Sequence, residues 1–383
     1  MTDLDTGGAD AVADTESVAD TESVAATESV ASTDSVADAT VIIIAYTPER
    51  WSLTCAAVES VFNQTVLPRE IILCVEGDPE FADRFRQRWQ RRPGSVPSIR
   101  VEGSQPSPEG GEEEGRSHAG QAPDQPQLRL DAARQDARCH ARIAAERSRG
   151  VELATTGIVV FLDDDATAEE DWLQRLLVPF ADPSVVAVGG APLPVYGKPR
   201  PRWLPFEFDW VLGCAYRGLP TKTAPVLRLI GATLAVRRES VLAVGGFHSL
   251  ADDLDIAHRL LALSPQSRLI YEPRAIVHHY VYEDRLTWRY FWRRCFWANR
   301  DKVAIMRGLG GAANLKADRS FVLRTLSVGV GRGLRELLGG DIGGLERALA
   351  IIAGVAISGV AYATGVVEWN IAAWRRGETT PAP

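Results

Sequence analysis

Cysteine is scarce in this chain of 383 residues. The five cysteines stand far apart, no two have CxxC spacing, and the acidic N-terminus lacks the positively charged, apolar pattern of a signal peptide. These absences argue against disulfide bonding and favour a reducing, cytoplasmic setting.

Basic residues are absent from the first 39 positions, which hold ten Asp or Glu. The whole chain has a net charge of −8, so the remaining residues are close to neutral and give no argument for nucleic-acid binding. From Ala13 a six-residue unit repeats as ADTESV, ADTESV, AATESV and ASTDSV, with a single Val to bury in each unit. Such a segment cannot offset its ordering entropy, so residues 1–39 are predicted to be a disordered acidic tail.

Short apolar, β-branched runs alternate with helical patterns after this tail. Three runs are typical of buried strands: VIIIA (41–45), EIILCV (70–75) and GIVVFL (157–162). The patterns of residues 51–64 and 131–149 are typical of the helices between them. Strand, helix and strand in this order predict an α/β domain, with a mostly parallel, Rossmann-like sheet flanked by helices.

Later segments extend this domain to about residue 282. We expect a helix near 168–180, a strand around 185–188, a helix near 253–263 and two strands, RLIY and AIVHH. Residues 93–127 lack an apolar period and contain EGGEEEG, which predicts a mobile insertion within the domain 40–282.

Residues 283–383 are predicted to form a helical, membrane-associating region. Residues 285–300 interleave Arg with Trp, Tyr and Phe, which suits a helix in the lipid headgroup layer or one packed on the domain. RNA binding could use the same composition, but no nucleic-acid module surrounds it. Residues 348–367 contain no charge and are long enough to span a bilayer, although their many small residues leave a buried or re-entrant hairpin open.

Three consecutive carboxylates, Asp163, Asp164 and Asp165, directly follow the predicted strand GIVVFL. In open α/β sheets ligands bind beyond the carboxyl ends of the strands, so this triplet should face a cleft. Adjacent carboxylates repel one another unless a cation lies among them, and hard divalent ions prefer oxygen ligands. The alternative is an acidic turn in solvent. His278 and His279 end the strand AIVHH, and either could be a further metal ligand or a structural histidine.

Several segments, in this order along the chain, resemble family 2 glycosyltransferases with the GT-A fold: VIIIAYTPER, EIILCVEGD, ERSRG, FLDDDA, GATLAVRRES followed by VGGF, and ADDLDIAHRL. The resemblance covers roughly residues 40–305. It implies a GT-A domain that transfers a sugar with inversion from a nucleotide diphosphate donor, a UDP- or GDP-sugar, with the help of Mg²⁺ or Mn²⁺.

The resemblance also assigns roles to residues at the donor site. FLDDDA matches the DxD-type site, which makes Asp163 and Asp165 the metal ligands, with Asp165 favoured. Residues implied to contact the donor are Tyr46, Glu76, Arg147, Asp163 and Asp164. Glu76 stands where the family usually has Asp, so the preference for the nucleotide base stays open. Ser148 replaces the Asn that follows the motif arginine. The structural alternatives are a packed core tyrosine for Tyr46, a solvent-facing charge at a strand end for Glu76, and a helix-surface arginine for Arg147.

The segment ADDLDIAHRL resembles the family's ED motif, with Asp253 as the catalytic base and Asp252 in the Glu position on the acceptor side. Inversion needs one carboxylate to take the proton of the acceptor hydroxyl, whereas a hydrolase would need two opposed carboxyl groups. The alternative is capping of a helix N-terminus by these acidic residues. Arg237 and Arg238 lie near the expected acceptor site and could meet a phosphate on a lipid-linked acceptor.

The sequence thus predicts an inverting glycosyltransferase at the cell membrane, with its catalytic domain facing the cytoplasm. Its implied acceptor is a polyprenyl or dolichyl phosphate-linked glycan, used in protein glycosylation or surface polysaccharide assembly, as in haloarchaeal enzymes of the glucosyl-dolichyl phosphate glucuronosyltransferase type. Two alternatives remain. A sugar-phosphate nucleotidyltransferase would normally carry a Gly-rich basic loop after the first strand, which TPERWS is not. A non-catalytic glycan-binding protein would not need both acidic motifs.

Overall fold

The computed structural model describes residues 35–89, 96–103, 141–248, 252–309 and 319–376. Nearly all of the predicted acidic tail, most of the predicted insertion and the start of the predicted helix 131–149 lie outside the described residues.

The N-terminal half of the sheet is parallel, as predicted. Its four strands, in the order β3-β2-β1-β4, are β1 (Val36–Ala45), β2 (Leu67–Val75), β3 (Ser98–Gly103) and β4 (Ile158–Asp163). Strand β1 begins four residues before the predicted start of the domain, because Val36 and Ala37 already pair with the first residues of β2.

Strand β3 corrects one part of the predicted mobile insertion 93–127, because residues 98–103 form a strand. It pairs in register with β2, and its Ile99 and Val101 pack against the main core. Two apolar residues separated by Arg100 are too short a pattern to be recognised against the Pro- and Gly-rich sequence around them.

The C-terminal half of the sheet is mixed rather than parallel. Strand β8 (Thr233–Arg237) runs antiparallel to both β4 and β6 (Val185–Tyr196), while β6 and β9 (Arg268–Val281) are parallel. Two short strands, β5 (Ala166–Ala168) and β7 (Ala224–Val226), pair antiparallel with β9. The two strands predicted at RLIY and AIVHH are one strand, because an irregularity opposite Gly189 to Ala191 of β6 lets the pairing continue past Pro273.

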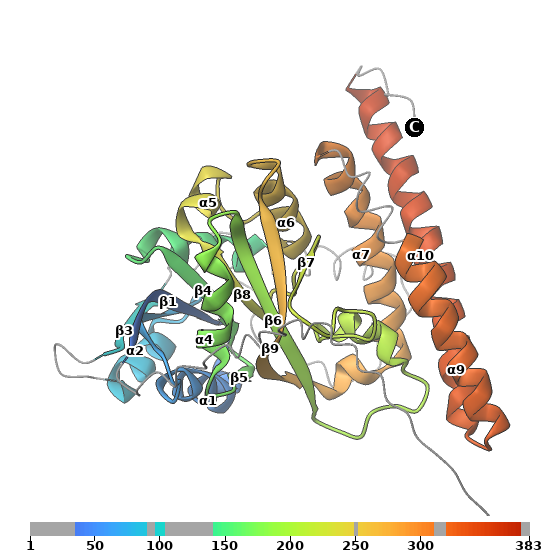
Figure 1. The fold of residues 1–383 in the computed structure, drawn as a ribbon, viewed down its shortest axis with the longest axis horizontal. Helices are drawn as coiled ribbons and strands as arrows, with labels where there is room; N and C mark the ends of the chain where they lie inside the picture. Colours follow the sequence, from blue (N-terminus) through green and yellow to red (C-terminus); the bar gives the residue numbers. More distant parts are fainter. Residues whose placement is uncertain (1–34, 90–95, 104–140, 249–251, 310–318, 377–383) are drawn as a thin grey trace, which may run out of the picture. The chain divides into compact units, whose positions relative to one another are not determined.

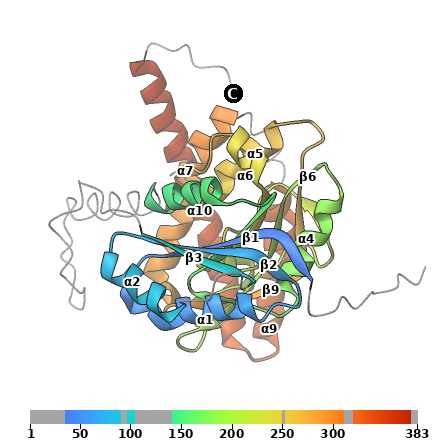
Figure 2. The same cartoon turned by 90° about the vertical axis from the view of Figure 1, so that its left-hand side faces the viewer.

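Helices cover both faces of this sheet. On one face, α1 (Trp51–Phe62), α2 (Pro79–Arg88), α4 (Trp172–Leu177) and the 3-10 helix η2 (Val178–Ala181) contribute to the first core cluster. On the other, the helix 141–153, α5 (Arg238–Ala243) and α6 (Asp252–Ala262) form a second cluster. Figure 2 shows α1 and α2 on one side of β1 to β3 and α5 and α6 on the opposite side.

A third core joins the C-terminal helices to the sheet domain. Leu204, Phe208, Phe291, Cys295 and Ile351 are buried in it, from the loop after β6, η3 (Phe206–Leu212), α7 (Trp288–Leu309) and α10 (Ile342–Arg375). The segment 285–300 therefore packs on the domain over part of its surface. The chain also forms η1 (Pro48–Arg50), η4 (Glu283–Leu286), the π-helical η5 (Phe321–Leu326) and α9 (Ser327–Leu338).

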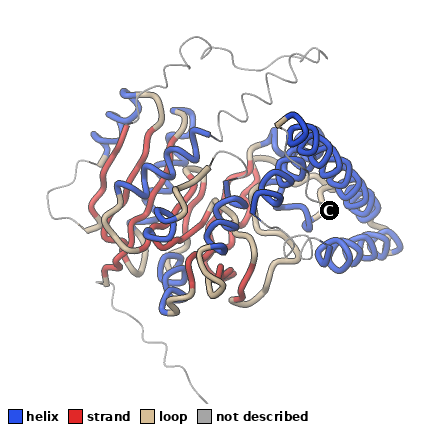
Figure 3. Tube along the Cα trace, turned by 90° about the horizontal axis from the view of Figure 1, so that it is seen from above, coloured by secondary structure: helices blue, strands red, loops and turns tan. Residues whose placement is uncertain are grey.

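Figures 1 and 3 show the C-terminal helices α7, α9 and α10 gathered beside the strands, with α10 running along α7. Among the described residues, α10 is the one helix with the length and mean hydropathy of a membrane span. It extends well beyond the uncharged run predicted at 348–367.

Candidate active site

Parallel pairing brings three predicted site segments to one edge of the sheet. Ala45 of β1 lies opposite Val75 of β2, and Ile44 lies opposite Asp163 at the end of β4. The residues that follow these strands, Tyr46, Glu76 and the aspartate triplet, therefore share the carboxyl edge, where open α/β sheets bind their ligands.

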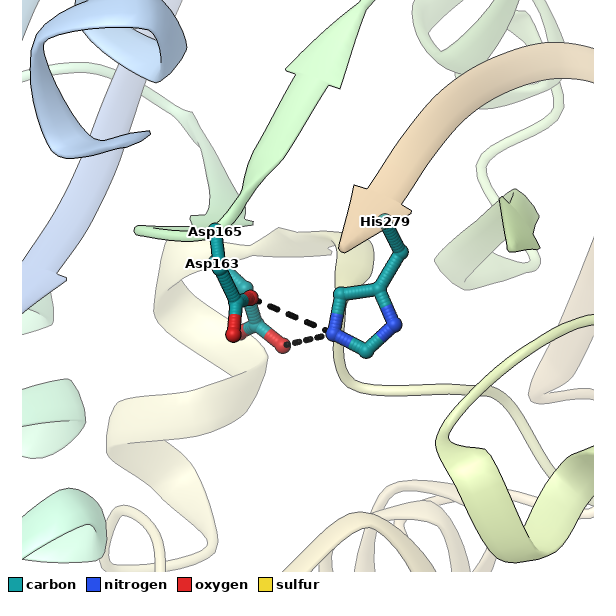
Figure 4. A group of neighbouring side chains, drawn as sticks. All are labelled: Asp163, Asp165 and His279. Carbon is teal, nitrogen blue, oxygen red and sulfur yellow. Dashed lines mark ion pairs between the residues drawn. The ribbon is translucent and has the colours of Figure 1, made fainter. Parts of the chain in front are cut away.

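Asp163, Asp165 and His279 form a cluster able to hold a metal ion (Figure 4). Antiparallel pairing of Ala166 with His279 brings β9 beside the triplet. His279 Nε2 lies 3.2 Å from Asp165 Oδ1 and 4.0 Å from Asp163 Oδ2, and one ligand atom from each residue lies within 4.8 Å of the others. Two carboxylates and one imidazole fit Mn²⁺ or another first-row cation, and carboxylates also suit Mg²⁺.

The neighbouring histidine lies away from this cluster. Side chains alternate along β9, so His278 lies on the other face, exposed, with its Nε2 3.2 Å from Glu169 Oε1. Of the two histidines that the sequence left open, the structure brings only His279 to the aspartates. Its second ring nitrogen, Nδ1, lies 3.4 Å from Cys214 Sγ, which helps to orient the ring.

Arg50 completes the acidic cluster, and the sequence analysis missed it. Its NH1 donates to Asp164 Oδ1 at 2.9 Å and lies 3.3 Å from Asp165 Oδ2, while its guanidinium stacks over the Tyr282 ring at 4.7 Å. Arg50 ends η1, directly after the first strand. An arginine in a polar turn is common, so only its place beyond a buried strand could have identified it.

Burial and neighbouring cations act in opposite directions on the pKa values of the aspartates. Burial raises the pKa of Asp163 against the attraction of Arg147, and raises the pKa of Asp164 to about 7 against that of Arg50. At Asp165 the effect of burial is outweighed by the hydrogen bond from His279, and the pKa is lowered. The same hydrogen bond outweighs burial at His279 and raises its pKa to about 10. Without a metal ion, protonated His279 therefore partly neutralises the two carboxylates, and it would release this proton on ligating a metal.

One carboxylate oxygen of Asp164 has no hydrogen-bond partner among the described residues. This atom, Oδ2, is buried. A buried carboxylate oxygen in this state is costly, which is consistent with a site that gains a cation or a donor group when a ligand binds.

Arg147 joins the triplet to the predicted base. It lies in the helix 141–153, and its NH1 donates to Asp253 Oδ1 at 3.1 Å while its NH2 lies 3.6 Å from Asp163 Oδ1. NH2 also donates to the carbonyl oxygen of Gly231 at 3.3 Å. The side chain is buried, so one planar guanidinium fixes the distance between two carboxylates that lie 90 positions apart in the sequence.

Asp253 is held from both of its carboxylate oxygens. While Oδ1 accepts from Arg147, Oδ2 accepts from the backbone N–H of Gly231 at 3.0 Å. A Cβ at Gly231 would overlap the Asp253 carboxylate, so only glycine lets the loop before β8 approach this closely. Asp255, two residues further along α6, pairs at 2.5 Å with Arg259 one turn later and stabilises the helix. Asp252 begins α6, and its side chain lies outside the description.

The two predicted donor residues on the neighbouring strands lie at the same edge. Glu76 Oε1 forms an ion pair at 3.2 Å with Arg142 NH1, from the same helix as Arg147. Tyr46 is half-buried and packs against the second core cluster. Both positions are compatible with a nucleotide pocket beside the triplet, and also with the packing roles that the sequence left open.

Arg237 and Arg238 are not near this edge, which corrects their assignment to an acceptor site. Strand β8 is antiparallel to β4, so Arg237 lies opposite Ile158, at the far end of β4 from Asp163. Arg237 donates to the carbonyl oxygens of Phe180, Asp182 and Val185. Arg238 donates to those of Val151 and Glu152, at the end of the helix 141–153. Both arginines satisfy backbone carbonyls.

Known proteins resemble this chain over long stretches. It is 27% identical over 274 residues to the glucosyl-dolichyl phosphate glucuronosyltransferase of Haloferax volcanii, covering 69% of this chain and 75% of that one. It is 29% identical over 205 residues to the pre-mycofactocin glycosyltransferase of Mycobacterium tuberculosis, covering 49% of this chain and 41% of that one.

Among solved structures, a mannosyltransferase from Pyrobaculum calidifontis in complex with GDP-Man and Mn²⁺ aligns over 87% of this chain and 89% of its own, with a TM-score of 0.48 and 15% identity. The model of glycosyl transferase family 2 matches residues 138–245, which include Arg147 and the aspartate triplet. The chain therefore contains a glycosyl transferase family 2 domain.

Proposed function

We propose that this glycosyltransferase moves a sugar from a UDP- or GDP-sugar to a hydroxyl group of a polyprenyl or dolichyl phosphate-linked glycan, with inversion at the anomeric carbon. The observation that carries the proposal is the link made by Arg147. One buried guanidinium contacts both Asp163, in the candidate metal cluster, and Asp253, the candidate base. A donor and an acceptor bound between these two groups would meet at a fixed separation.

The carboxyl edge of the sheet would bind the donor. Glu76 and Tyr46 would border the nucleotide, and Asp163, Asp165 and His279 would hold Mg²⁺ or Mn²⁺. Such an ion neutralises the charge that builds up on a departing diphosphate. Arg147, with its fork of N–H donors, would orient the same phosphates once they displace part of its contact with Asp163.

Asp253 would act as the general base. As the acceptor oxygen attacks the anomeric carbon, its proton passes to the Asp253 carboxylate and the bond from the sugar to the diphosphate breaks. The N–H of Gly231 holds one carboxylate oxygen, so the other can turn toward the acceptor when Arg147 engages the donor. Placing the base and the leaving group on opposite sides of the sugar gives inversion.

The acceptor and the location rest on the relatives and on α10. The Haloferax volcanii relative is a glucosyl-dolichyl phosphate glucuronosyltransferase, and α10 has the length and hydropathy of a membrane helix. A lipid-linked acceptor presented at a membrane surface is consistent with both. The catalytic domain would face the cytoplasm, where nucleotide sugars are made.

Transfer from radiolabelled UDP- and GDP-sugars to extracted membrane lipids, with Mn²⁺ present, tests the proposal. The wild type should release a nucleoside diphosphate and label a lipid. Asp253→Asn should lower kcat by about 10²- to 10⁴-fold while donor binding stays within a few fold, because Asn keeps the acceptor for Gly231 but cannot take a proton. Release of pyrophosphate instead would indicate nucleotidyl transfer, and undiminished transfer by Asp253→Asn would reject this base.

A further inference from the structure

Helix α10 has the reverse of the usual distribution of side chains. With one exception, Ile351, its buried residues are small: Gly343, Gly344, Ala348, Ala350, Gly354, Ala361, Gly365 and Ala373. Its exposed side includes large apolar residues, namely Ile342, Leu349, Ile352, Val360, Val367, Ile371 and Trp374. A helix in water exposes polar groups, whereas helices in lipid pack through small residues and turn large apolar ones outward.

The buried side of α10 is fixed to the rest of the domain along its whole length. Near its start, Gly344 contacts Gly333 of α9 with no space for a Cβ. In its middle, Gly354 lies against the rings of Phe208 and Phe291, and near its end Gly365 lies against the carbonyl of Arg300 in α7. Figure 1 shows α10 following α7 over this distance.

The elements that pack against α10 carry charged and polar groups close to it. Arg300 Nε pairs with Glu368 at 2.7 Å and Arg307 NH1 donates to Asn370 at 2.9 Å, while η3 buries Glu207 and Asp209. If α10 crossed a bilayer along its normal, α7 and η3 would be drawn into the hydrocarbon with these groups. Charged side chains are strongly disfavoured in the hydrocarbon core of a bilayer.

The exposed charges near this surface are mostly basic. The C-terminal helices expose seven arginines on α7, α10 and the segment from residue 319 through α9, which are Arg289, Arg294, Arg319, Arg324, Arg335, Arg375 and Arg376. Their exposed acidic residues include Glu346 and Glu368. Trp288 and Trp292 of α7 are also exposed. Arginine and tryptophan around an apolar face match the anionic headgroup layer of a membrane.

We propose that η5, α9 and α10 form a monotopic membrane-binding surface. Helix α10 lies in the plane of the bilayer, with its outer side at the boundary between headgroups and acyl chains, and both its ends stay on the same side as the catalytic edge. Exposed Val322, Leu323, Val328, Leu334 and Leu338 of η5 and α9 extend the apolar surface. This inference does not depend on the proposed reaction, and its test needs no turnover.

Depth measurements along α10 distinguish this arrangement from a span. Spin labels at Leu349→Cys, Val360→Cys and Ile371→Cys, in full-length protein on vesicles of phosphatidylcholine and phosphatidylglycerol, report depth from relaxation by oxygen and by a water-soluble nickel complex. Wild type treated with the label corrects for native cysteines, and Glu239→Cys on α5 is the water-exposed reference. We expect the three labels to lie at similar, shallow depths that differ by no more than about 5 Å, the rise of one helical turn. A maximum at Val360 would mean a span, and water exposure at all three sites would mean no membrane contact; either result overturns the proposal.

A charge substitution tests the surface independently. Ile352→Glu with Val360→Glu should lower the fraction of protein that sediments with the same vesicles by at least tenfold. The matched control, Val178→Glu with Leu263→Glu, places the same charge at exposed apolar positions of the sheet domain and should leave sedimentation unchanged. Equal losses in the two pairs, or no loss in the α10 pair, would contradict the proposal.

Discussion

Two regions of this molecule depart from the usual rule of burial in opposite directions. At the carboxyl edge of the sheet, Arg147, Asp164, Asp165 and His279 are each at most 5% exposed. On α10, by contrast, Val360 and Trp374 are 62% and 77% exposed. Buried charges are costly unless they are paired, and exposed apolar surface is costly unless something covers it.

The difference lies in how each cost is offset. The carboxylates at the edge are paired with cations of the same chain, Arg50, Arg147 and His279, so that region is held together without a ligand. The outer side of α10 consists of residues that contact little else in the described chain. Removing one charge should therefore destabilise the edge, whereas on α10 only a change on the packed side should disturb packing.

The largest effect should follow from the loss of a cluster carboxylate. Asp165→Ala removes one of three candidate ligands, so Mn²⁺-dependent binding of UDP or GDP should weaken by at least about 100-fold. Calorimetric titration with and without Mn²⁺ measures it. Glu169→Ala removes a nearby exposed carboxylate that pairs with His278 and should have little effect. Full Mn²⁺-dependent binding by Asp165→Ala would overturn the metal role of this residue.

Removal of Arg50 should test the internal pairing at the edge. Arg50→Met leaves Asp164 and Asp165 without one cation and should lower the free energy of unfolding by about 3 kcal/mol, measured by urea denaturation without metal. Arg69→Met breaks an ion pair with Asp38 in which both side chains are more than half exposed, and should cost less than about 1 kcal/mol. Similar losses for the two variants would show that the edge does not depend on this pairing.

The Arg50 variant should also depend on pH. The pKa of Asp164 in the folded protein is raised to about 7, above its value in the unfolded chain, so its ionisation destabilises the fold as the pH rises through that range. Without Arg50 the pKa rises further. The loss of stability should therefore be larger at pH 8 than at pH 5.5, because at the lower pH Asp164 holds a proton.

Two glycines of α10 sharpen the comparison between its packed and outer sides. A Cβ at Gly354 would lie 2.6 Å from the Phe208 ring, whereas one at Gly359 would meet nothing within 4 Å. Gly354→Ala should lower stability by about 1–3 kcal/mol through overpacking. Gly359→Ala should raise it by up to about 1 kcal/mol through helix propensity. Thermal denaturation of the full chain in detergent measures both, and equal shifts would mean that α10 is not packed as described.

The sequence predicted β1, β2 and β4 of the parallel half because these strands contain uninterrupted apolar runs. It failed at β3, whose two apolar residues carry too little pattern, and at β9, which was expected as two strands and is one through its pairing with β6. It placed Asp163 to Asp165 at a strand end because position along one strand is local information. It could not find Arg50, or choose His279 over His278, because both depend on which strands become neighbours.

The smallest effect should come from Arg238, whose assignment changed for the same reason. The sequence placed it near the acceptor, but antiparallel pairing of β8 takes it to the opposite edge, where it binds carbonyls at the end of the helix that carries Arg147. Arg238→Ala should therefore cost about 1 kcal/mol of stability, through lost hydrogen bonds and lost positive charge at a helix C-terminus. Its kcat/KM for donor and lipid acceptor should stay within about twofold of wild type, equivalent to less than about 0.5 kcal/mol. A selective rise in KM for the acceptor would restore the acceptor role, because a residue that only closes a helix should not distinguish donor from acceptor.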